Sequence, residues 1–144
     1  MKRFVEYRTV RFGECDPAGV VYYPVFFNWY HELMEAWFEQ ELKISYAQCI
    51  KKIGFPAKNI QTEFFRPCAM GEQIRLELYL SRRTARSITL EVDIWGPDNH
   101  KKTHGSIVCV CIGVSTEGFR FRPQEIPADL SEKMDFFLQE GEEG

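Results

Sequence analysis

The segment from Pro24 to residue 39 places the strongest constraint on the fold, because its apolar side chains recur at helical spacing and most of them are aromatic. The apolar positions are Val25, Trp29, Leu33 and Trp37, each followed by another at Phe26, Tyr30, Met34 and Phe38. This repeat predicts an amphipathic helix, and proline suits the first turn, where its missing N–H would be unpaired in any case. A face this wide and bulky has to be covered by other elements of the chain.

Two segments further along alternate apolar with polar residues, which is the pattern of half-buried strands. In residues 73–83 and 86–95 the apolar positions are Ile74, Leu76, Leu78, Leu80, Ile88, Leu90, Val92 and Ile94. Residues 103–115 are apolar on both faces over several positions and therefore predict a central strand. Residues 3–12 and 59–67 also have the composition of strands.

Two more helices are expected, one over residues 46–53, ended by Gly54, and one within residues 126–141. A strand, one long helix and then four consecutive strands predict an α+β protein, in which a curved antiparallel sheet wraps around the central helix. A chain of 144 residues is expected to form one domain, residues 1–144, with its own core. A single sheet leaves two edges and one open surface, which a second copy would cover, so we expect a homodimer or a homotetramer.

Charge and composition exclude several classes of protein. The formal net charge of −3 provides no general positive field for nucleic acid, and no run of about 18 apolar residues predicts a membrane span. The first residues carry charges at every second or third position, unlike a signal peptide. Five cysteines are an odd number, which argues against a secreted disulfide framework. We therefore expect a cytoplasmic protein without a cofactor.

A zinc site can be imagined from His100, His104, Cys109 and Cys111. The two histidines lie in a strand and hairpin context, however, where side chains four residues apart on one face are about 13 Å from each other. Ligands of one zinc ion lie far closer together than that. We expect no metal site, and we interpret the two alternating cysteines as small core residues of a strand.

A carboxylate stands between the first strand and the long helix, in the turn-forming run Asp16-Pro17-Ala18-Gly19. Apolar surroundings make a carboxylate a stronger base, and a helix start offers unpaired N–H groups at the positive end of its dipole. Thioester hydrolysis needs this combination, a nucleophile or base together with a group that stabilises charge on the carbonyl oxygen. The alternative is that Asp16 only shapes the turn, as Asp-Pro runs often do.

The turn is followed by Val20 and Val21, then Tyr22-Tyr23-Pro24 and the aromatic helix. With these residues the chain resembles the hotdog-fold acyl-CoA thioesterases, most closely the 4-hydroxybenzoyl-CoA thioesterase type, over nearly its whole length in element order. The resemblance implies the hotdog fold and an active site between subunits. It also implies that Asp16 is the catalytic nucleophile or general base and that the backbone N–H of Tyr23 binds the thioester oxygen.

The resemblance further implies a substrate pocket that includes Gly19 and His31. The hydroxybenzoyl enzyme has an acid for the phenol hydroxyl at the position of His31, so this departure bears on 4-hydroxybenzoyl specificity and leaves the hydrolysis chemistry intact. The related Tol-Pal-associated thioesterases, which prefer short or other acyl chains, have a histidine at the position of Pro24. The expected substrate is therefore an aroyl-CoA or short-acyl-CoA, with the aroyl group favoured.

Arg82, Arg83 and Arg86 lie at the junction of two predicted strands. Guanidinium groups bind phosphates through two parallel hydrogen bonds, and relatives of the type that the chain resembles carry a basic cluster here for the nucleotide end of CoA. We expect these arginines to bind CoA. The alternative is a solvated hairpin.

Cys15 lies beside Asp16, where it could act as a nucleophile. A negative neighbour raises the pKa of a thiol, which is the wrong direction for activation, so packing is its expected role. Two other function classes are a non-catalytic hotdog module, which binds CoA or acyl groups or serves as a scaffold, and a hotdog dehydratase or hydratase. A scaffold does not need Asp16. A dehydratase usually pairs a histidine with an acid on a hydration motif around the central helix, and neither an HD nor a DxxH motif occurs in this sequence.

Overall fold

The computed structural model describes residues 2–115 and 118–138, and its main element is a five-stranded antiparallel sheet. The strands lie in the order β1-β4-β5-β6-β3. Their bounds are β1 Arg3–Thr9, β4 Gln73–Arg83, β5 Ser87–Trp95, β6 Lys101–Val110 and β3 Ala57–Phe64. The sheet therefore has β1 at one edge and β3 at the other.

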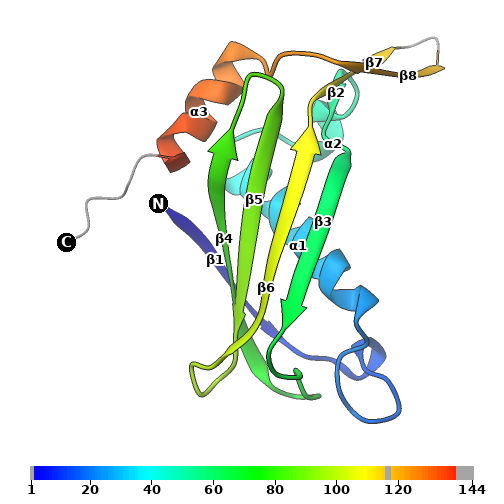
Figure 1. Ribbon diagram of the computed structural model, residues 1–144, viewed down its shortest axis with the longest axis vertical. Helices are drawn as coiled ribbons and strands as arrows, with labels where there is room; N and C mark the ends of the chain where they lie inside the picture. Colours follow the sequence, from blue (N-terminus) through cyan, green and yellow to red (C-terminus); the bar gives the residue numbers. More distant parts are fainter. Residues whose placement is uncertain (1, 116–117, 139–144) are drawn as a thin grey trace.

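The remaining elements are three helices, a turn of 3-10 helix and a small three-stranded sheet. Helix α1 (Pro24–Gln40) lies across one face of the large sheet, and α3 lies beside β4 (Figure 1). The others are the 3-10 turn Phe12–Glu14, α2 Tyr46–Cys49, α3 Ala128–Leu138, and strands β2 Ile53–Gly54, β7 Ile112–Ser115 and β8 Gly118–Pro123. The small sheet has the order β2-β7-β8.

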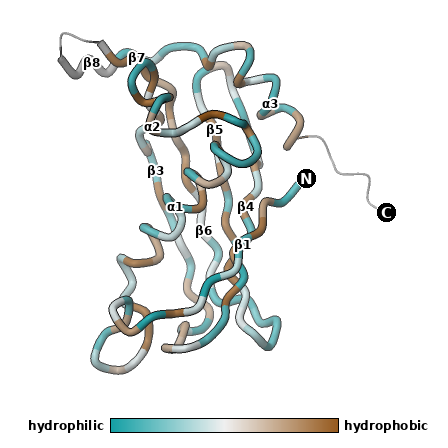
Figure 2. The backbone as a smooth tube through the Cα atoms, turned by 180° about the vertical axis from the view of Figure 1, so that it is seen from behind, coloured by the Kyte–Doolittle hydropathy of each residue, from teal (hydrophilic) through white to brown (hydrophobic). Residues whose placement is uncertain are grey.

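The core forms between α1 and the inner face of the large sheet, as the two sequence periods require. The eight alternating positions of β4 and β5 named above are at most 4% exposed. Every apolar residue of the predicted helix face is buried except Val25, which is partly buried. Seen from the helix side, apolar and polar segments alternate along the strands behind α1 (Figure 2).

Tyr30 connects the middle of α1 to the sheet. Its hydroxyl forms hydrogen bonds of 2.7 Å with Thr62 Oγ1 of β3 and 3.1 Å with Thr103 Oγ1 of β6. A Cβ atom on Gly105 would come within 2.5 Å of the Tyr30 ring. This glycine therefore allows the close approach of α1 to the sheet, and a larger residue there would push the helix away.

The fold confirms the predicted α+β class and hotdog architecture, with a curved antiparallel sheet packed around the long helix. The strands expected near residues 59–67, 73–83 and 86–95 are present, as is the closing helix. β6 lies between two other strands, as predicted for the segment that is apolar on both faces.

Four predicted elements had wrong boundaries. The strand expected over residues 59–67 is Ala57–Phe64, and two of the other differences are strand ends that coincide with the end of the neighbouring strand. β1 stops at Thr9, whose partner is the first residue of β4. Residues 103–115 form two strands and not one. β6 ends at Val110, because its partner there is Ser87, the first residue of β5, and the chain beyond Cys111 pairs with β2. The short helix ends at Cys49, since Ile53 pairs with Gly113. The predicted single sheet was therefore wrong, because β7 belongs to a second, smaller one.

The buried apolar residues of the described ranges, with the exception of Ile112, form one core, and the assignment of residues 1–144 to a single domain stays a prediction. Within residues 2–115 and 118–138, no helix combines the length and the apolar character that a membrane crossing requires.

Candidate active site

The Asp16 turn is a closed loop that leads from β1 into α1. The Asp16 N–H donates to the Val20 carbonyl at 2.9 Å, and the Gly19 N–H donates to the Asp16 carbonyl at 2.9 Å. Gly19 has a φ of +79°, in the left-handed region that glycine adopts without strain. Just outside this pair, the Tyr22 N–H donates to the Glu14 carbonyl at 3.0 Å. The sequence therefore folds locally into a tight turn that presents the Asp16 side chain.

The two carboxylate oxygens of Asp16 have different surroundings. Oδ1 accepts a 2.8 Å hydrogen bond from the Ala18 N–H and so stabilises the turn. In the described part of the chain, Oδ2 has neither a hydrogen-bond partner nor an ion-pair partner. The side chain is partly exposed. Asp16 therefore shapes the turn with one oxygen, and the other oxygen is not engaged by any of the described residues.

The first amides of α1 lie at the other end of this loop. The Val25 N–H donates to the Tyr22 carbonyl at 2.9 Å, and the Phe26 N–H donates to the Tyr23 carbonyl at 3.2 Å. The Tyr23 N–H donates to no acceptor among the described residues. An unpaired N–H at the positive end of a helix is suited to stabilise a developing oxyanion.

Glu14 fastens this loop to the rest of the molecule. Its carboxylate accepts hydrogen bonds from Arg8 Nη2 at 2.6 Å, Trp29 Nε1 at 2.7 Å and the Arg11 N–H at 2.8 Å. Partial burial acts to raise the pKa of Glu14, but these hydrogen bonds outweigh it and hold the pKa below its usual range. Sequence reasoning missed Glu14, because its two side-chain partners, Arg8 and Trp29, come from β1 and α1.

The opposite side of the loop rests on residues 68–70. The Val21 N–H donates to the Cys68 carbonyl at 2.9 Å, and the Met70 N–H donates to the Gly19 carbonyl at 3.0 Å. The loop is therefore held on two sides, which fixes the position of its carboxylate.

Cys15 has surroundings that disfavour a thiolate. Desolvation raises the pKa of its thiol, and the negative charges of Glu14 and Asp16 raise it further. The side chain packs against the core, and its sulfur donates to the Arg11 carbonyl at 3.5 Å. These features fit the packing role expected from the sequence.

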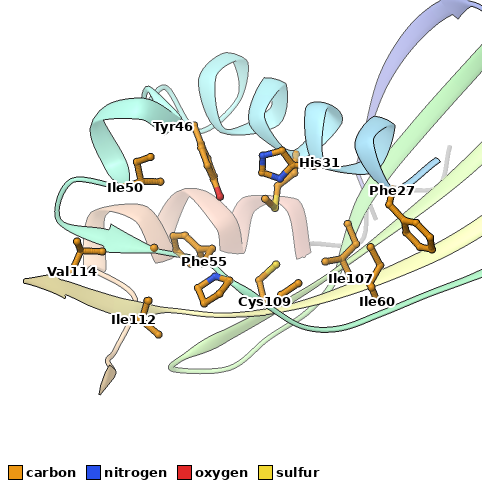
Figure 3. A pocket seen from close by; sticks show the side chains of 14 residues that line it. Phe27, His31, Tyr46, Ile50, Phe55, Ile60, Ile107, Cys109, Ile112 and Val114 are labelled. Carbon is orange, nitrogen blue, oxygen red and sulfur yellow. The ribbon is translucent and has the colours of Figure 1, made fainter. Parts of the chain in front are cut away.

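His31 lines an apolar cavity of about 410 Å³ between α1, α2 and the strands (Figure 3). Its Nε2 atom is 2.8 Å from Glu35 Oε1, and its ring meets the Tyr46 ring edge-on at a centroid distance of 5.6 Å. Gly19 does not line this cavity and lies instead in the Asp16 turn. The two residues expected in one substrate pocket thus occupy different parts of the site, and sequence reasoning did not single out Glu35 or Tyr46.

A second, more open groove of about 310 Å³ lies beside the start of α1. Aromatic side chains of Tyr23, Phe26, Phe64 and Phe65 line it. Phe64 belongs to the edge strand β3, and its ring packs edge-on against Phe26 at 5.3 Å. The free edge of the large sheet is therefore next to the first turn of α1.

The three arginines of the β4–β5 hairpin have different partners. Arg83 binds Asp135 of α3 through two contacts, at 2.5 and 2.8 Å, which raises the pKa of Arg83 and lowers that of Asp135. Arg82 and Arg86 are exposed, and their guanidinium groups have no partner among the described side chains. The hairpin and the Asp16 loop lie at opposite ends of the sheet (Figure 1). Within one subunit the structure therefore does not bring them together.

The residues of the imagined zinc set have other surroundings. His104 Nδ1 is 2.7 Å from the buried carboxylate of Asp93, and His100 is exposed near Asp98. Cys109 and Cys111 are buried, and burial raises the pKa of both thiols to about 11. Among residues 2–115 and 118–138, no group of three or more His, Cys, Asp or Glu side chains has an arrangement that could hold a metal ion.

Residues 10–134 match the model of one protein family, the thioesterase-like superfamily. Among curated relatives, a 1,4-dihydroxy-2-naphthoyl-CoA hydrolase of Gloeothece citriformis is 35% identical over 94 residues, which cover 62% of each chain. The corresponding hydrolase of Prochlorococcus marinus is 32% identical over 93 residues, 58% of this chain and 61% of the relative. The matched region thus spans about six tenths of the length of these relatives.

Solved structures agree in fold. A 1,4-dihydroxy-2-naphthoyl-CoA thioesterase from Synechocystis superposes with a TM-score of 0.82 at 21% identity, covering 93% of this chain and 96% of that one. A gentisyl-coenzyme A thioesterase superposes with a TM-score of 0.78 at 25% identity, covering 89% of this chain and 99% of the other.

Proposed function

Since this chain belongs to the thioesterase-like superfamily, we propose that it hydrolyses the thioester of an acyl-CoA to the free acid and CoA. One observation carries the proposal. The loop between β1 and α1 holds the Asp16 carboxylate and ends at the N–H of Tyr23. Among residues 2–115 and 118–138, neither Asp16 Oδ2 nor the Tyr23 N–H has a hydrogen-bond partner. These are the two groups that thioester hydrolysis requires.

The Asp16 carboxylate has two possible chemical roles in this reaction. As a nucleophile, it attacks the carbonyl carbon, expels the CoA thiolate and forms a mixed anhydride, which water then hydrolyses. As a general base, it removes a proton from the water that attacks the same carbon. In both routes the carbonyl oxygen becomes negative, and the Tyr23 N–H and the dipole of α1 stabilise it.

For the acyl group we propose an aroyl group. The curated relatives are named as hydrolases of 1,4-dihydroxy-2-naphthoyl-CoA, and one similar structure is of a gentisyl-coenzyme A thioesterase. The cavity beside α1 supports this choice, because Phe27, Tyr46 and Phe55 give it aromatic walls. His31, where the hydroxybenzoyl type has an acid, argues against 4-hydroxybenzoyl-CoA as the preferred substrate.

We propose that the active form is a homodimer or homotetramer with its sites at a subunit interface, located in the cytoplasm. In the part of the chain that the structure describes, β3 is an edge strand whose one partner is β6, and it is exposed along nearly its whole length. Ile60, Phe64 and the following Phe65 are 41%, 50% and 52% exposed. An unpaired edge with apolar side chains is a surface that a second copy can cover.

The same assembly would explain how the hairpin arginines reach CoA. β5 is nine residues long, so roughly 30 Å of sheet separates the hairpin from the Asp16 loop of the same subunit. A two-fold axis beside β3 and perpendicular to the sheet would make the partner's strands antiparallel and would bring its hairpin to the end that carries Asp16. We propose that Arg82 and Arg86 bind the nucleotide end of CoA, and that Arg83 instead holds the hairpin to α3.

The test is release of free CoA thiol from a panel of acyl-CoAs. The panel contains 1,4-dihydroxy-2-naphthoyl-, gentisyl-, 4-hydroxybenzoyl- and short aliphatic CoA thioesters. We expect turnover of the hydroxylated aroyl thioesters at the highest kcat/KM. A protein that binds acyl-CoA tightly and releases no thiol from any of them would instead be a non-catalytic binding module.

A further inference from the structure

Lys102 is a charged side chain that the fold buries near one end of the large sheet. It belongs to β6 and is 7% exposed. Its place in the strand is irregular, because Ile94 of β5 pairs with Thr103 whereas the next residue, Trp95, pairs with Lys101. Lys102 is therefore an extra residue in β6, a β-bulge, and a bulge redirects a side chain. Lys102 and Thr103 are accordingly both buried, although neighbours in a regular strand point to opposite faces.

The redirected Lys102 side chain holds the loop between β3 and β4, residues 65–72, which we call the supporting loop. Lys102 Nζ donates to the Pro67 carbonyl at 3.0 Å and lies 3.3 Å from Glu72 Oε2. The backbone carbonyl of Lys102 accepts the Phe65 N–H at 2.9 Å. One residue of β6 therefore contacts the supporting loop at its start, in its middle and at its end.

Glu72 holds the supporting loop from the other side. Its Oε1 atom accepts the Ala69 N–H at 2.5 Å, and its own N–H donates to the Ala69 carbonyl at 3.1 Å. The Glu72 carbonyl accepts the Val10 N–H at 2.9 Å, which connects the loop to the chain just after β1. The Lys102–Glu72 pair thus determines the conformation of the loop between its two ends.

The Asp16 loop rests on this supporting loop, and both lie at the same end of the large sheet (Figure 1). The Cys68 carbonyl accepts the Val21 N–H at 2.9 Å, and the Met70 N–H donates to the Gly19 carbonyl at 3.0 Å. These two contacts lie on either side of Ala69, the residue that Glu72 holds. A shift of the supporting loop would therefore move the turn that carries the carboxylate.

The Lys102–Glu72 pair is largely buried, with side-chain exposures of 9% and 24%. Such a pair often adds little net stability, because the cost of removing both charges from water offsets their attraction. It can instead fix one arrangement of the chain. The hydrogen bonds of this pair end on the Pro67 carbonyl and the Ala69 N–H, so they define where the backbone of the supporting loop lies.

We propose that Lys102 and Glu72 are positioning residues of the thioesterase site, which hold the supporting loop in the conformation that places the Asp16 carboxylate relative to the Tyr23 N–H. The inference rests on the proposed function and adds two residues that sequence reasoning did not single out. Neither side chain contacts the reacting atoms. Their effect passes through the backbone contacts between the supporting loop and the Asp16 loop.

The kinetic test uses the double variant Lys102→Met/Glu72→Gln, which removes both charges, nearly keeps the side-chain sizes and leaves an amide oxygen for the Ala69 N–H. We expect a urea midpoint near that of wild type, because both charges leave together. We expect kcat for the best acyl-CoA to fall by about tenfold through misplacement of the carboxylate, with KM within about twofold of wild type. Lys101→Met is the matched control, since Lys101 Nζ lies 3.4 Å from Asp93 and not at the loop, and its kcat should be that of wild type. A folded double variant with the wild-type kcat would overturn the proposal.

Amide hydrogen exchange keeps this proposal separate from the proposed function, since it needs no substrate. The Val21 and Met70 N–H groups, which join the two loops, should exchange at least about tenfold faster in the double variant. The Leu90 N–H, in a strand that is paired on both sides, should exchange at the wild-type rate. Acceleration of all three by the same factor would mean that the pair stabilises the whole fold, and the positioning role would be wrong.

The two measurements together assign any failure to one proposal. If wild type hydrolyses no acyl-CoA but exchange changes as expected, the catalytic proposal fails and the anchoring of the Asp16 loop by Lys102 and Glu72 stands. If wild type hydrolyses thioesters and neither kcat nor exchange responds to the double substitution, the positioning role fails alone.

Discussion

The carboxylate of Glu14 accepts a 2.7 Å hydrogen bond from the indole N–H of Trp29. Glu14 stands at the start of the loop that carries Asp16, and Trp29 belongs to α1, whose first turn follows Tyr23. The same carboxylate oxygen also accepts a 2.6 Å bond from Arg8 of β1. The hydrogen bonds of Glu14 therefore fix the position of Asp16 Oδ2 relative to the first amides of α1. The Asp16 oxygen and these amides would have to contact the same thioester carbonyl.

Replacing Glu14 by glutamine should loosen that connection. The amide keeps the size of the side chain, but its NH2 group faces donors from Arg8 and Trp29 that the carboxylate now satisfies. We expect the free energy of unfolding to fall by about 1–3 kcal/mol, and kcat to fall although Asp16 is unchanged. Urea unfolding and acyl-CoA kinetics measure the two effects. Glu39→Gln, at an exposed position of α1, is the control, and equal stability of the two variants would contradict the prediction.

Acid should destabilise the protein through the same carboxylate. Hydrogen bonds hold the pKa of Glu14 below its ordinary value of 4.5. A pKa lowered by folding contributes stability above the unfolded-state value, and this contribution is lost as the pH falls through the folded-state value. We therefore expect stability to decrease as the pH falls below about 4.5. In urea titrations from pH 6 to pH 3, Glu14→Gln should show a shallower decrease than wild type, and parallel curves would refute this.

The hairpin arginines should separate into two functional groups. Replacing Arg82 and Arg86 together by glutamine is expected to raise KM for acyl-CoA and to weaken its dependence on salt, with kcat little changed, because uniform binding is lost. Arg83→Gln should instead lower stability, since it removes the paired contacts with Asp135. Initial rates at several salt concentrations and thermal unfolding test both statements. An unaltered KM in the double variant would make the hairpin a solvated surface only.

The edge strand should mediate assembly. We expect sedimentation at micromolar concentration to show at least a dimer, and Phe65→Glu, just after β3, to shift it towards monomer, because a charge then replaces an exposed apolar side chain. Phe136→Glu is the matched control, since Phe136 is 50% exposed and lies on α3. A wild-type monomer that is stable and active would rule the interface out.

The sequence predicted the elements whose pattern is local. Trp29 and Trp37 repeat at helical spacing in α1, and the alternation in β4 and β5 gave the buried face of both strands. The point at which a strand changes its partner is not a local property. Cys111 is as apolar as its neighbours, yet its N–H bonds to the Arg86 carbonyl at 2.7 Å, just before β5 begins, and the next residues join the small sheet.

The same distinction applies to the candidate site. Asp16 and Tyr23 are seven positions apart, so one loop contains both, and sequence reasoning could find them. The other contacts join distant segments, as when Arg83 meets Asp135 52 positions later. The position of Tyr46 opposite His31 likewise depends on how α2 packs against α1. No periodicity or motif encodes those pairings.

The sharpest prediction concerns Asp16→Asn. The asparagine side-chain oxygen can accept the Ala18 N–H as Oδ1 does now at 2.8 Å, so the turn and the thermal stability should stay near wild type. The amide can act neither as nucleophile nor as base, and loss of such a group typically costs at least about 10²-fold. We therefore expect kcat for the best aroyl-CoA to fall by on the order of 10²-fold or more.

Three further variants make the result specific. Asp16→Glu should also be poor, because one added methylene displaces the carboxylate by about 1 Å, whereas Cys15→Ala should keep most of the activity. Asp98→Asn is the matched control, because the Asp98 carboxylate accepts the His100 N–H at 3.2 Å in a turn between β5 and β6, and its rate should be that of wild type. Thiol release and thermal unfolding are measured on the same preparations. If folded Asp16→Asn protein hydrolyses at a comparable rate, the catalytic group lies elsewhere, and Cys15 and His31 are the next residues to replace.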